Sequence, residues 1–327
     1  MANAPITEFG EQVLANLEKV IVGKRDALEL VIISLLCQGH VLIEDVPGVG
    51  KTMLARSLAR SLECTFSRIQ FTSDMLPSDV TGVSIYNQQK RKFEFRAGPI
   101  IGQIVLADEI NRATPKTQAA LLEAMEERQV TVDGVSHHLP RPFMVLATQN
   151  PIEYEGTFPL PEAQLDRFLI RVRLGYPDLL DEMRIIDSQQ LRHPIESLKP
   201  VIKLKHVLLA AEAIKGVFVS AAAKRYITDL SRRTRQSGDI YLGASPRGTL
   251  SLARAAQARA ALNGRDYVLP DDVKDVAVAV LAHRIIVSPA ARMRELSADR
   301  IVQEIIHSAP VPGGDFGMSA AASGAPA

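Results

Sequence analysis

Apolar runs alternate with helical patterns over roughly the first half of the chain. Five runs have the length and composition of buried strands, at residues 40–44, 66–70, 104–108, 143–148 and 168–172. Segments with helical periodicity separate most of these runs. This alternation predicts an α/β fold with a parallel five-stranded sheet.

The pattern changes after Pro177, where the strand signals end and helical periodicity continues. Helices are expected at residues 178–191, 206–213, 220–235, 247–261, 270–282 and 298–306. We therefore expect an α/β domain with N-terminal helices over residues 1–176 and an all-helical domain over residues 177–308. Residues 309–327 are rich in Gly, Ala, Ser and Pro, which predicts a disordered tail.

Two insertions interrupt the α/β part. In residues 80–102, apolar and polar residues alternate on both sides of a polar stretch at 87–90. In residues 128–139, alternating valines flank Asp133-Gly134, a pair typical of a two-residue type I′ turn. Each insertion is predicted to be a β-hairpin without a strongly apolar exposed face. The hairpins either decorate the sheet edge or face a partner or a pore.

The first strand leads into a turn with the residues of a phosphate-binding loop. Pro47, Gly48 and Gly50 force the turn, and Lys51 and Thr52 precede a helix expected over residues 53–62. Successive backbone N–H groups and the helix N-terminus present positive partial charge to a polyphosphate. Lys51 adds a full charge at the β- and γ-phosphates, and the Thr52 hydroxyl can ligate Mg²⁺.

One position departs from the usual loop pattern. Asp45 stands where the pattern has its first glycine. Because the turn-forming residues that follow are intact, we interpret the loop as an active variant, with the Asp45 carboxylate near the phosphates.

Polar side chains end the third and fourth strands. Asp108 and Glu109 follow the third strand, and ligands bind at the carboxyl ends of strands in open α/β sheets. Asp108 suits coordination of Mg²⁺, directly or through water. Glu109 suits orienting and deprotonating a water that attacks the γ-phosphate. Asn150 ends the fourth strand and either caps a turn with Pro151 or holds the attacking water.

Two arginines are further candidates. Arg167 precedes the fifth strand and follows Asp166. An arginine beside an aspartate usually forms a surface ion pair, which contributes little to stability. Arg247 opens a helix of the second domain, where a cation opposes the helix dipole, which indicates an anionic ligand nearby.

Composition narrows the class of protein. The chain is 46% apolar and 23% charged, as globular proteins are, and a net charge of +1 creates no overall field toward nucleic acid or membrane. The longest apolar stretches are too short to span a bilayer, and no signal-peptide pattern opens the sequence. Cys37 and Cys64 lack metal-binding spacing, so we expect reduced core residues of a cytoplasmic protein.

Taken together, these motifs resemble the AAA+ ATPases, and more narrowly the MoxR family. The resemblance covers residues 21–306. The phosphate loop and the acid pair are typical of AAA+ proteins in general, whereas the later segments are specific to MoxR-like proteins. The resemblance rests on residues 44–52, 106–113, 147–151, 160–168 and 243–247.

The resemblance implies a ring, usually a hexamer, with ATP between subunits. Lys51, Thr52, Asp108, Glu109 and Asn150 would act in one subunit, with Thr52 and Asp108 at Mg²⁺. The resemblance also implies which residues bind the nucleotide, with the first two lining the adenine pocket: Val22, Gly23, Pro47, Gly48, Val49, Gly50, Lys51, Thr52 and Met53.

The same resemblance implies roles for the two arginines and for the insertions. Arg167 would reach into the neighbouring subunit's site as an arginine finger, and Arg247 would sense the γ-phosphate from the lid. The hairpins match inserts that tend to point at the ring's centre. Family members are thought to remodel or activate partners that carry von Willebrand factor A domains, often in metal or cofactor insertion.

The sequence is also compatible with two other functions. A motor on nucleic acid would share both hairpins, and basic residues at 90–92 and 224–235 could bind phosphates. With a net charge near zero, a solvated basic face is favoured. The ATPase subunit of a metal chelatase is the second alternative.

Overall fold

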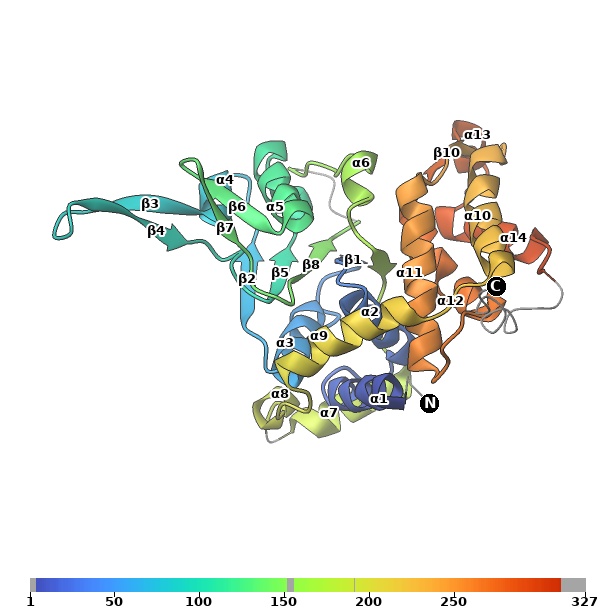
Figure 1. Cartoon of the computed structure of the whole chain (residues 1–327), viewed down its shortest axis with the longest axis horizontal. Helices are drawn as coiled ribbons and strands as arrows, with labels where there is room; N and C mark the ends of the chain where they lie inside the picture. The colour runs from blue at the N-terminus through green and yellow to red at the C-terminus, as the bar shows by residue number, and fades with distance from the viewer. Residues whose placement is uncertain (1–3, 152–155, 191, 313–327) are drawn as a thin grey trace, which may run out of the picture. The chain divides into compact units, whose positions relative to one another are not determined.

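A five-stranded sheet forms the centre of residues 11–208 (Figure 1). All its neighbouring strands are parallel. The computed structural model describes residues 4–151, 156–190 and 192–312. The predicted strands are confirmed to within two residues, in the order β2 (Phe66–Gln70), β5 (Ile104–Asp108), β8 (Met144–Gln149), β1 (Val41–Glu44), β9 (Ile170–Val172).

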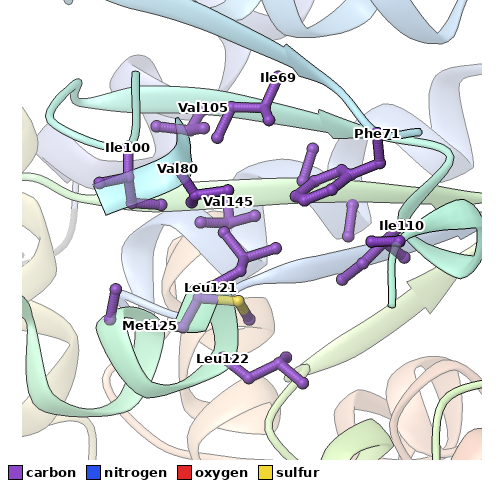
Figure 2. Packing of buried hydrophobic residues seen from close by; sticks show 14 of the residues in the cluster. Ile69, Phe71, Val80, Ile100, Val105, Ile110, Leu121, Leu122, Met125 and Val145 are labelled. Carbon is purple, nitrogen blue, oxygen red and sulfur yellow. The ribbon is translucent and has the colours of Figure 1, made fainter. Parts of the chain in front are cut away.

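Helices cover the sheet because its central strands are apolar on both faces. β5 is buried throughout, and helix α5 (Pro115–Glu127) packs Leu121 and Met125 against the same cluster as Val105 and Val145 (Figure 2). Each such buried side chain stabilises the fold by about 1.5–3 kcal/mol. The other helices of this unit are α2 (Arg25–Leu36), α3 (Lys51–Ser61), α4 (Pro77–Thr81), α6 (Glu162–Leu165), α7 (Leu179–Gln189) and α8 (Pro194–Ser197).

Both predicted hairpins are present. One pairs β3 (Gly82–Asn87) with β4 (Lys92–Ala97), and Figure 1 shows it projecting away from the sheet. The other pairs β6 (Gln129–Val132) with β7 (Val135–His138), and the positive φ angles of Asp133 and Gly134 fit the predicted type I′ turn. The Phe95 ring stacks on His137 at 3.8 Å, which joins the two hairpins.

The prediction about the exposed face of the first hairpin is wrong. Val83, Ile85, Tyr86 and Phe93 are all exposed, Phe93 by 71%. Tyr86 and Phe93 face each other across the strands as an edge-to-face pair at 5.3 Å. Alternation along these strands places Tyr86 and Phe93 on one face of the hairpin and Val83 and Ile85 on the other, so both faces expose apolar side chains.

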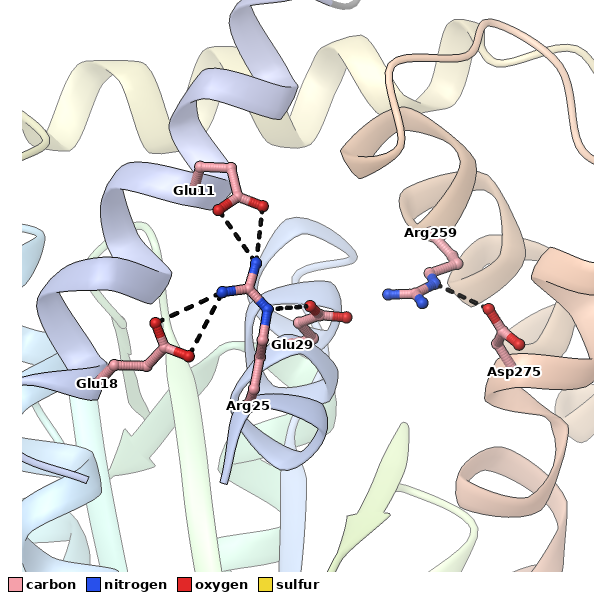
Figure 3. Close-up of polar contacts among 6 residues, drawn as sticks. All are labelled: Glu11, Glu18, Arg25, Glu29, Arg259 and Asp275. Atoms are coloured by element: carbon pink, nitrogen blue, oxygen red, sulfur yellow. Dashed lines mark hydrogen bonds and ion pairs between the residues drawn. The ribbon is translucent and has the colours of Figure 1, made fainter. Parts of the chain in front are cut away.

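Helices α1 (Ala4–Glu18) and α2 are held together by one arginine. Figure 3 shows Arg25, at the start of α2, directed at three carboxylates. Its guanidinium lies 2.9 Å from Glu11, 3.4 Å from Glu18 and 3.2 Å from Glu29. Glu29 lies on α2 itself, so the pairs with Glu11 and Glu18 of α1 are the two that join the helices across the turn that contains Val22 and Gly23.

The chain divides into two compact units, residues 11–208 and residues 1–10 with 209–327, whereas the sequence predicted a division at 176/177. The segment after α7 stays with the sheet through backbone hydrogen bonds. The N–H groups of Val201 and Ile202 donate to the Ser61 carbonyl, at 2.9 and 3.1 Å. Arg60 donates to the carbonyl of Ile195 at 2.7 Å.

All six helices predicted after Pro177 are present within two residues at each end; the first is α7, which belongs with the sheet, and the other five lie wholly or partly in the second unit. They include α9 (Leu204–Ala213), α10 (Ala221–Gln236), α11 (Pro246–Leu262), α12 (Pro270–Leu281) and α14 (Ala298–Ser308), with α13 (Pro289–Met293) in addition. Arg259 of α11 pairs with Asp275 of α12 (Figure 3).

The prediction of an all-helical second domain needs one correction. β10 (Ile240–Leu242) and β11 (Ile286–Val287) form an antiparallel pair. Three and two residues are too few for a readable alternation, so the sequence pattern missed them. Most of the predicted disordered tail, residues 313–327, lies outside the described residues.

Two further predictions concern membrane-spanning segments and the two cysteines. Within the described chain, no helix is both long and apolar enough to cross a membrane. Within the described chain, Cys37 and Cys64 form no disulfide, and both are only half-buried, not core residues. Burial raises the pKa of the Cys64 thiol to about 12, which makes it unreactive.

Candidate active site at the carboxyl edge of the sheet

The polar residues predicted to act together meet where β1, β8 and β5 end. β1 and β8 are in register up to Glu44 and Gln149, and the Asp45 N–H donates to the Gln149 carbonyl at 3.2 Å. On the other side of β8, the Thr148 hydroxyl donates to Asp108 Oδ1 at 2.7 Å. Parallel pairing thus brings the phosphate loop, Asn150 and the acid pair to one edge.

The loop after β1 offers unused backbone donors. Gly48 and Gly50 have φ angles of 86° and 90°, a region that glycine adopts without strain. Among the described residues, the N–H groups of Gly48, Val49 and Gly50 have no protein acceptor. A Cβ built at Gly48 would meet nothing within 4 Å, so open space lies in front of the loop.

Helix α3 continues from this loop with its N-terminus at the same place. Pro47 and Val49 lie in the turn, and Lys51, Thr52 and Met53 form the first helical turn. Lys51 Nζ donates to the Asp45 carbonyl at 2.7 Å. Free N–H groups, a helix N-terminus and an ammonium therefore converge on one space, as an anion requires.

The expectation that the Asp45 carboxylate lies near the phosphates is wrong. Its Oδ1 accepts the N–H of Val46, and its Oδ2 accepts those of Leu174 at 2.6 Å and Gly175 at 2.7 Å. The side chain is buried, and two of its three backbone donors belong to the turn after β9.

The two acids are engaged from the neighbouring strand. Asp108 Oδ2 accepts from the Arg68 guanidinium at 2.7 Å. Glu109 Oε2 accepts from Gln70 Nε2 at 2.8 Å and from Arg112 at 3.2 Å. Glu109 has a φ of 58°, a sparsely populated region for a residue with a side chain, which indicates strain stored at this position.

Sequence reasoning missed Arg68 and Gln70. They are two residues apart on β2 and so lie on one face of that strand, and Arg68 also donates to the Gln70 side-chain oxygen. Two long polar side chains two residues apart, in a strand next to the one that carries the acid pair, are the sequence pattern that could have indicated these residues. They link Asp108 to Glu109 through a chain of hydrogen bonds.

The remaining predicted residues of this unit occupy two places. Asn150 is buried directly after β8. Val22 and Gly23 lie in the turn between α1 and α2, where Gly23 packs against the Asp181 carboxylate of α7. Ile21, next to them, lies near Gly50 of the phosphate loop, 3.5 Å from a Cβ built there.

Arg167 lies apart from this group. Arg167 comes just before β9, so it lies at the amino edge of the sheet, where its guanidinium pairs with Glu126 at 2.9 Å. A five-residue strand at about 3.3 Å per residue separates the two edges by roughly 16 Å. Arg247 belongs to the second unit, where it is exposed in the first turn of α11.

Comparisons with known proteins agree with this geometry. Residues 40–170 match the model of the ATPase family associated with various cellular activities (AAA), and residues 232–305 match the AAA lid domain. The chain is 39% identical to Chaperone MoxR1 of Mycobacterium tuberculosis, over 92% of this chain and 82% of that protein. This chain belongs to the MoxR family of AAA+ ATPases.

Two other similar proteins match nearly the whole chain. The uncharacterized protein YeaC of Bacillus subtilis is 53% identical, over 91% of this chain and 93% of YeaC. A crystal structure of a candidate ATPase from Cytophaga hutchinsonii superimposes with a TM-score of 0.87 at 38% identity, covering 95% of this chain and 97% of that one. The predicted AAA+ core with a helical lid is therefore confirmed.

Proposed function

We propose that this MoxR-family protein binds ATP with Mg²⁺ at the carboxyl edge of the sheet and hydrolyses it. The observation that carries the proposal is the phosphate loop. Three neighbouring N–H groups without protein acceptors, Lys51 and the N-terminus of α3 meet in front of Gly48. Such a concentration of donors suits the β- and γ-phosphates of a nucleotide.

The residues present fit Mg²⁺ held jointly with phosphates. In the described chain, no cluster of three His, Cys, Asp or Glu side chains could hold a metal alone. Thr52 would supply a hydroxyl, and Asp108 would act through water, because both its oxygens already accept hydrogen bonds. The metal would neutralise charge on the phosphate oxygens.

Glu109 is the proposed general base. Gln70 and Arg112 both donate to Oε2, and within the described residues Oε1 accepts no hydrogen bond, so Oε1 is left to take a proton from water. Thr148 fixes the backbone here, since its hydroxyl accepts the Glu109 N–H at 2.8 Å while it donates to Asp108. Asn150 would orient the attacking water from the end of β8.

A ring of copies, most simply a hexamer, would complete the site. Arg167 lies at the opposite edge from the phosphate loop of its own chain, which supports its acting in a neighbouring copy. A guanidinium from a second chain stabilises charge on the transferred phosphoryl group. Arg247 would sense the γ-phosphate from the lid, and Val22 with Gly23 would line the adenine pocket.

For the biological role we propose chaperone-like remodelling in the cytoplasm. The relative named Chaperone MoxR1 supports the class of activity, and the two cysteines, which form no disulfide in the described chain, fit a reducing compartment. Partners with von Willebrand factor A domains, and metal or cofactor insertion into them, are part of this proposal. A chelatase ATPase subunit is the alternative that shares this chemistry.

A motor on nucleic acid has less support. In the first hairpin, Lys90 and Lys92 both lie within ion-pair distance of Glu94, at 2.9 and 3.9 Å. In α10, Arg233 pairs with Asp229 at 2.6 Å and Arg235 donates to the Ala244 carbonyl. Cations already neutralised within the chain contribute less to phosphate binding.

Replacing Lys51 by alanine tests the proposal. ATP affinity, measured by calorimetry with Mg²⁺, should fall beyond detection, because the loop loses its full positive charge. Lys116→Ala, an exposed lysine on α5, is the control and should bind ATP normally. Undiminished ATP binding by Lys51→Ala would refute the phosphate-loop assignment.

A further inference from the structure

The Asp45 carboxylate joins the phosphate loop to a turn far along the chain. One oxygen accepts the Val46 N–H at 2.9 Å, within the loop. The other accepts the N–H groups of Leu174 and Gly175, which follow β9. The residue is 7% exposed, and an acceptor that serves three backbone donors, of which the Leu174 N–H is buried, is costly to remove, because the donors are then left unpaired.

The segment that Asp45 holds also contacts the turn at residues 22–24. The Tyr176 carbonyl, next after Gly175, accepts from Lys24 Nζ at 2.8 Å. Five residues later, Asp181 packs so closely on Gly23 that a Cβ there would lie 1.6 Å from its Oδ2. Residues 174–181 therefore contact both the phosphate loop and the loop that contains Val22 and Gly23.

We propose that Asp45 is a positioning residue that sets the spacing between the phosphate loop and residues 22–24. The inference rests on the proposed function, in which the first loop binds phosphates and the second binds the base. A nucleotide that binds both loops depends on this spacing, whereas a ligand made of phosphates alone does not. Glycine at position 45 would keep the turn but release the N–H groups of Leu174 and Gly175.

Two ligands, ATP and inorganic tripolyphosphate, separate binding that depends on the spacing of the two loops from binding to the phosphate loop alone. Asp45→Asn keeps the shape of the side chain, but its amide has one acceptor oxygen, so its NH₂ group must face Val46 or the 174–175 turn. In calorimetry with Mg²⁺, ATP affinity should fall about tenfold, the cost of one poorly paired buried group. Affinity for inorganic tripolyphosphate should change less than about threefold.

Equal losses for the two probes, or unchanged ATP affinity, would overturn the proposal. Asp79→Asn is the matched control, because Asp79 also accepts a backbone N–H, that of Leu76 at 2.8 Å, and lies on α4. It should change neither affinity.

A second variant keeps the test decisive if Asp45→Asn does not fold. Lys24→Met removes the solvent-exposed hydrogen bond to Tyr176, on the other side of the same turn. It should weaken ATP binding by about threefold or more and leave tripolyphosphate binding unchanged. Unchanged ATP binding by Lys24→Met would contradict the proposal. A wild-type protein that binds neither probe would instead refute the proposed function on which it rests.

Discussion

The two edges of the central sheet are built in opposite ways. At the carboxyl edge, the N–H groups of residues 48–50 have no protein acceptor in the described chain. Backbone donors without an acceptor cost stability, and such groups are expected where a ligand supplies the acceptor.

At the amino edge, backbone and side-chain groups pair with each other. The buried His40 ring accepts the Val145 N–H at Nδ1 and so donates from Nε2 to the Met125 carbonyl. Arg128 donates to the Gln38 carbonyl at 2.6 Å. The difference shows that one edge is arranged to receive a ligand and the other to hold the strands and α5 in place.

Arg167 is the exception at the amino edge. It is a cation that pairs with Glu126 but lies far from the acids of its own site. Arg167→Ala should therefore reduce ATP turnover by about 10³-fold or more while ATP affinity stays, because it removes only transition-state stabilisation. Steady-state hydrolysis and calorimetry check this, with Arg300→Ala, an exposed arginine beside Glu304, as the control. Turnover within a few-fold of wild type would show that this arginine has no part in the chemistry.

At the carboxyl edge, the chemistry can be separated from binding. Glu109→Gln keeps the shape and removes the base, so turnover should fall by roughly 10²-fold or more with ATP and Mg²⁺ still bound. Glu123→Gln, an exposed position on α5, is the control. If Glu109→Gln still hydrolyses ATP, another residue acts as the base. Asp45 is a poor candidate for that role, because its carboxylate already accepts three backbone N–H groups.

The smallest predicted effect lies at His40. Burial lowers the pKa of its ring to about 4 from 6.5, so the ring is neutral in the fold and takes up a proton more readily when unfolded. Its contribution is full above about pH 6.5 and is lost as pH falls toward 4. Between pH 7 and pH 5 the free energy of unfolding should drop by about 2 kcal/mol from this group.

Denaturant titrations at the two pH values measure that drop. His40→Gln should flatten the pH dependence, whereas His138→Gln on exposed β7 should not. An equal pH dependence in wild type and His40→Gln would show that the amino edge does not depend on a neutral His40.

The sequence predicted the strands and the residues at their ends because both depend on local signals. Apolar runs mark the buried strands, and Lys51 or Asp108 can be placed once strand and loop are recognised. Contacts between segments distant in sequence could not be predicted this way. Asp45 is bound by residues 174 and 175, and no local pattern indicates that its carboxylate turns from the loop.

Short or exposed elements were the other source of error. β10 and β11 are stabilised by pairing with each other rather than by a readable alternation. The apolar residues of β3 and β4 were visible as a period-two pattern, but which face would be covered depends on the rest of the fold.

In the proposed ring, the amino edge of one copy supplies Arg167 to the site at the carboxyl edge of another copy. Mixing Lys51→Ala with Arg167→Ala tests it most directly, because a mixed ring pairs an intact phosphate loop from one copy with an intact Arg167 from the other. Each variant alone should be nearly inactive, and ATP hydrolysis should partly recover in the mixture and rise with protein concentration. No recovery, in a mixture shown to co-assemble, would contradict the action of Arg167 in a neighbouring copy.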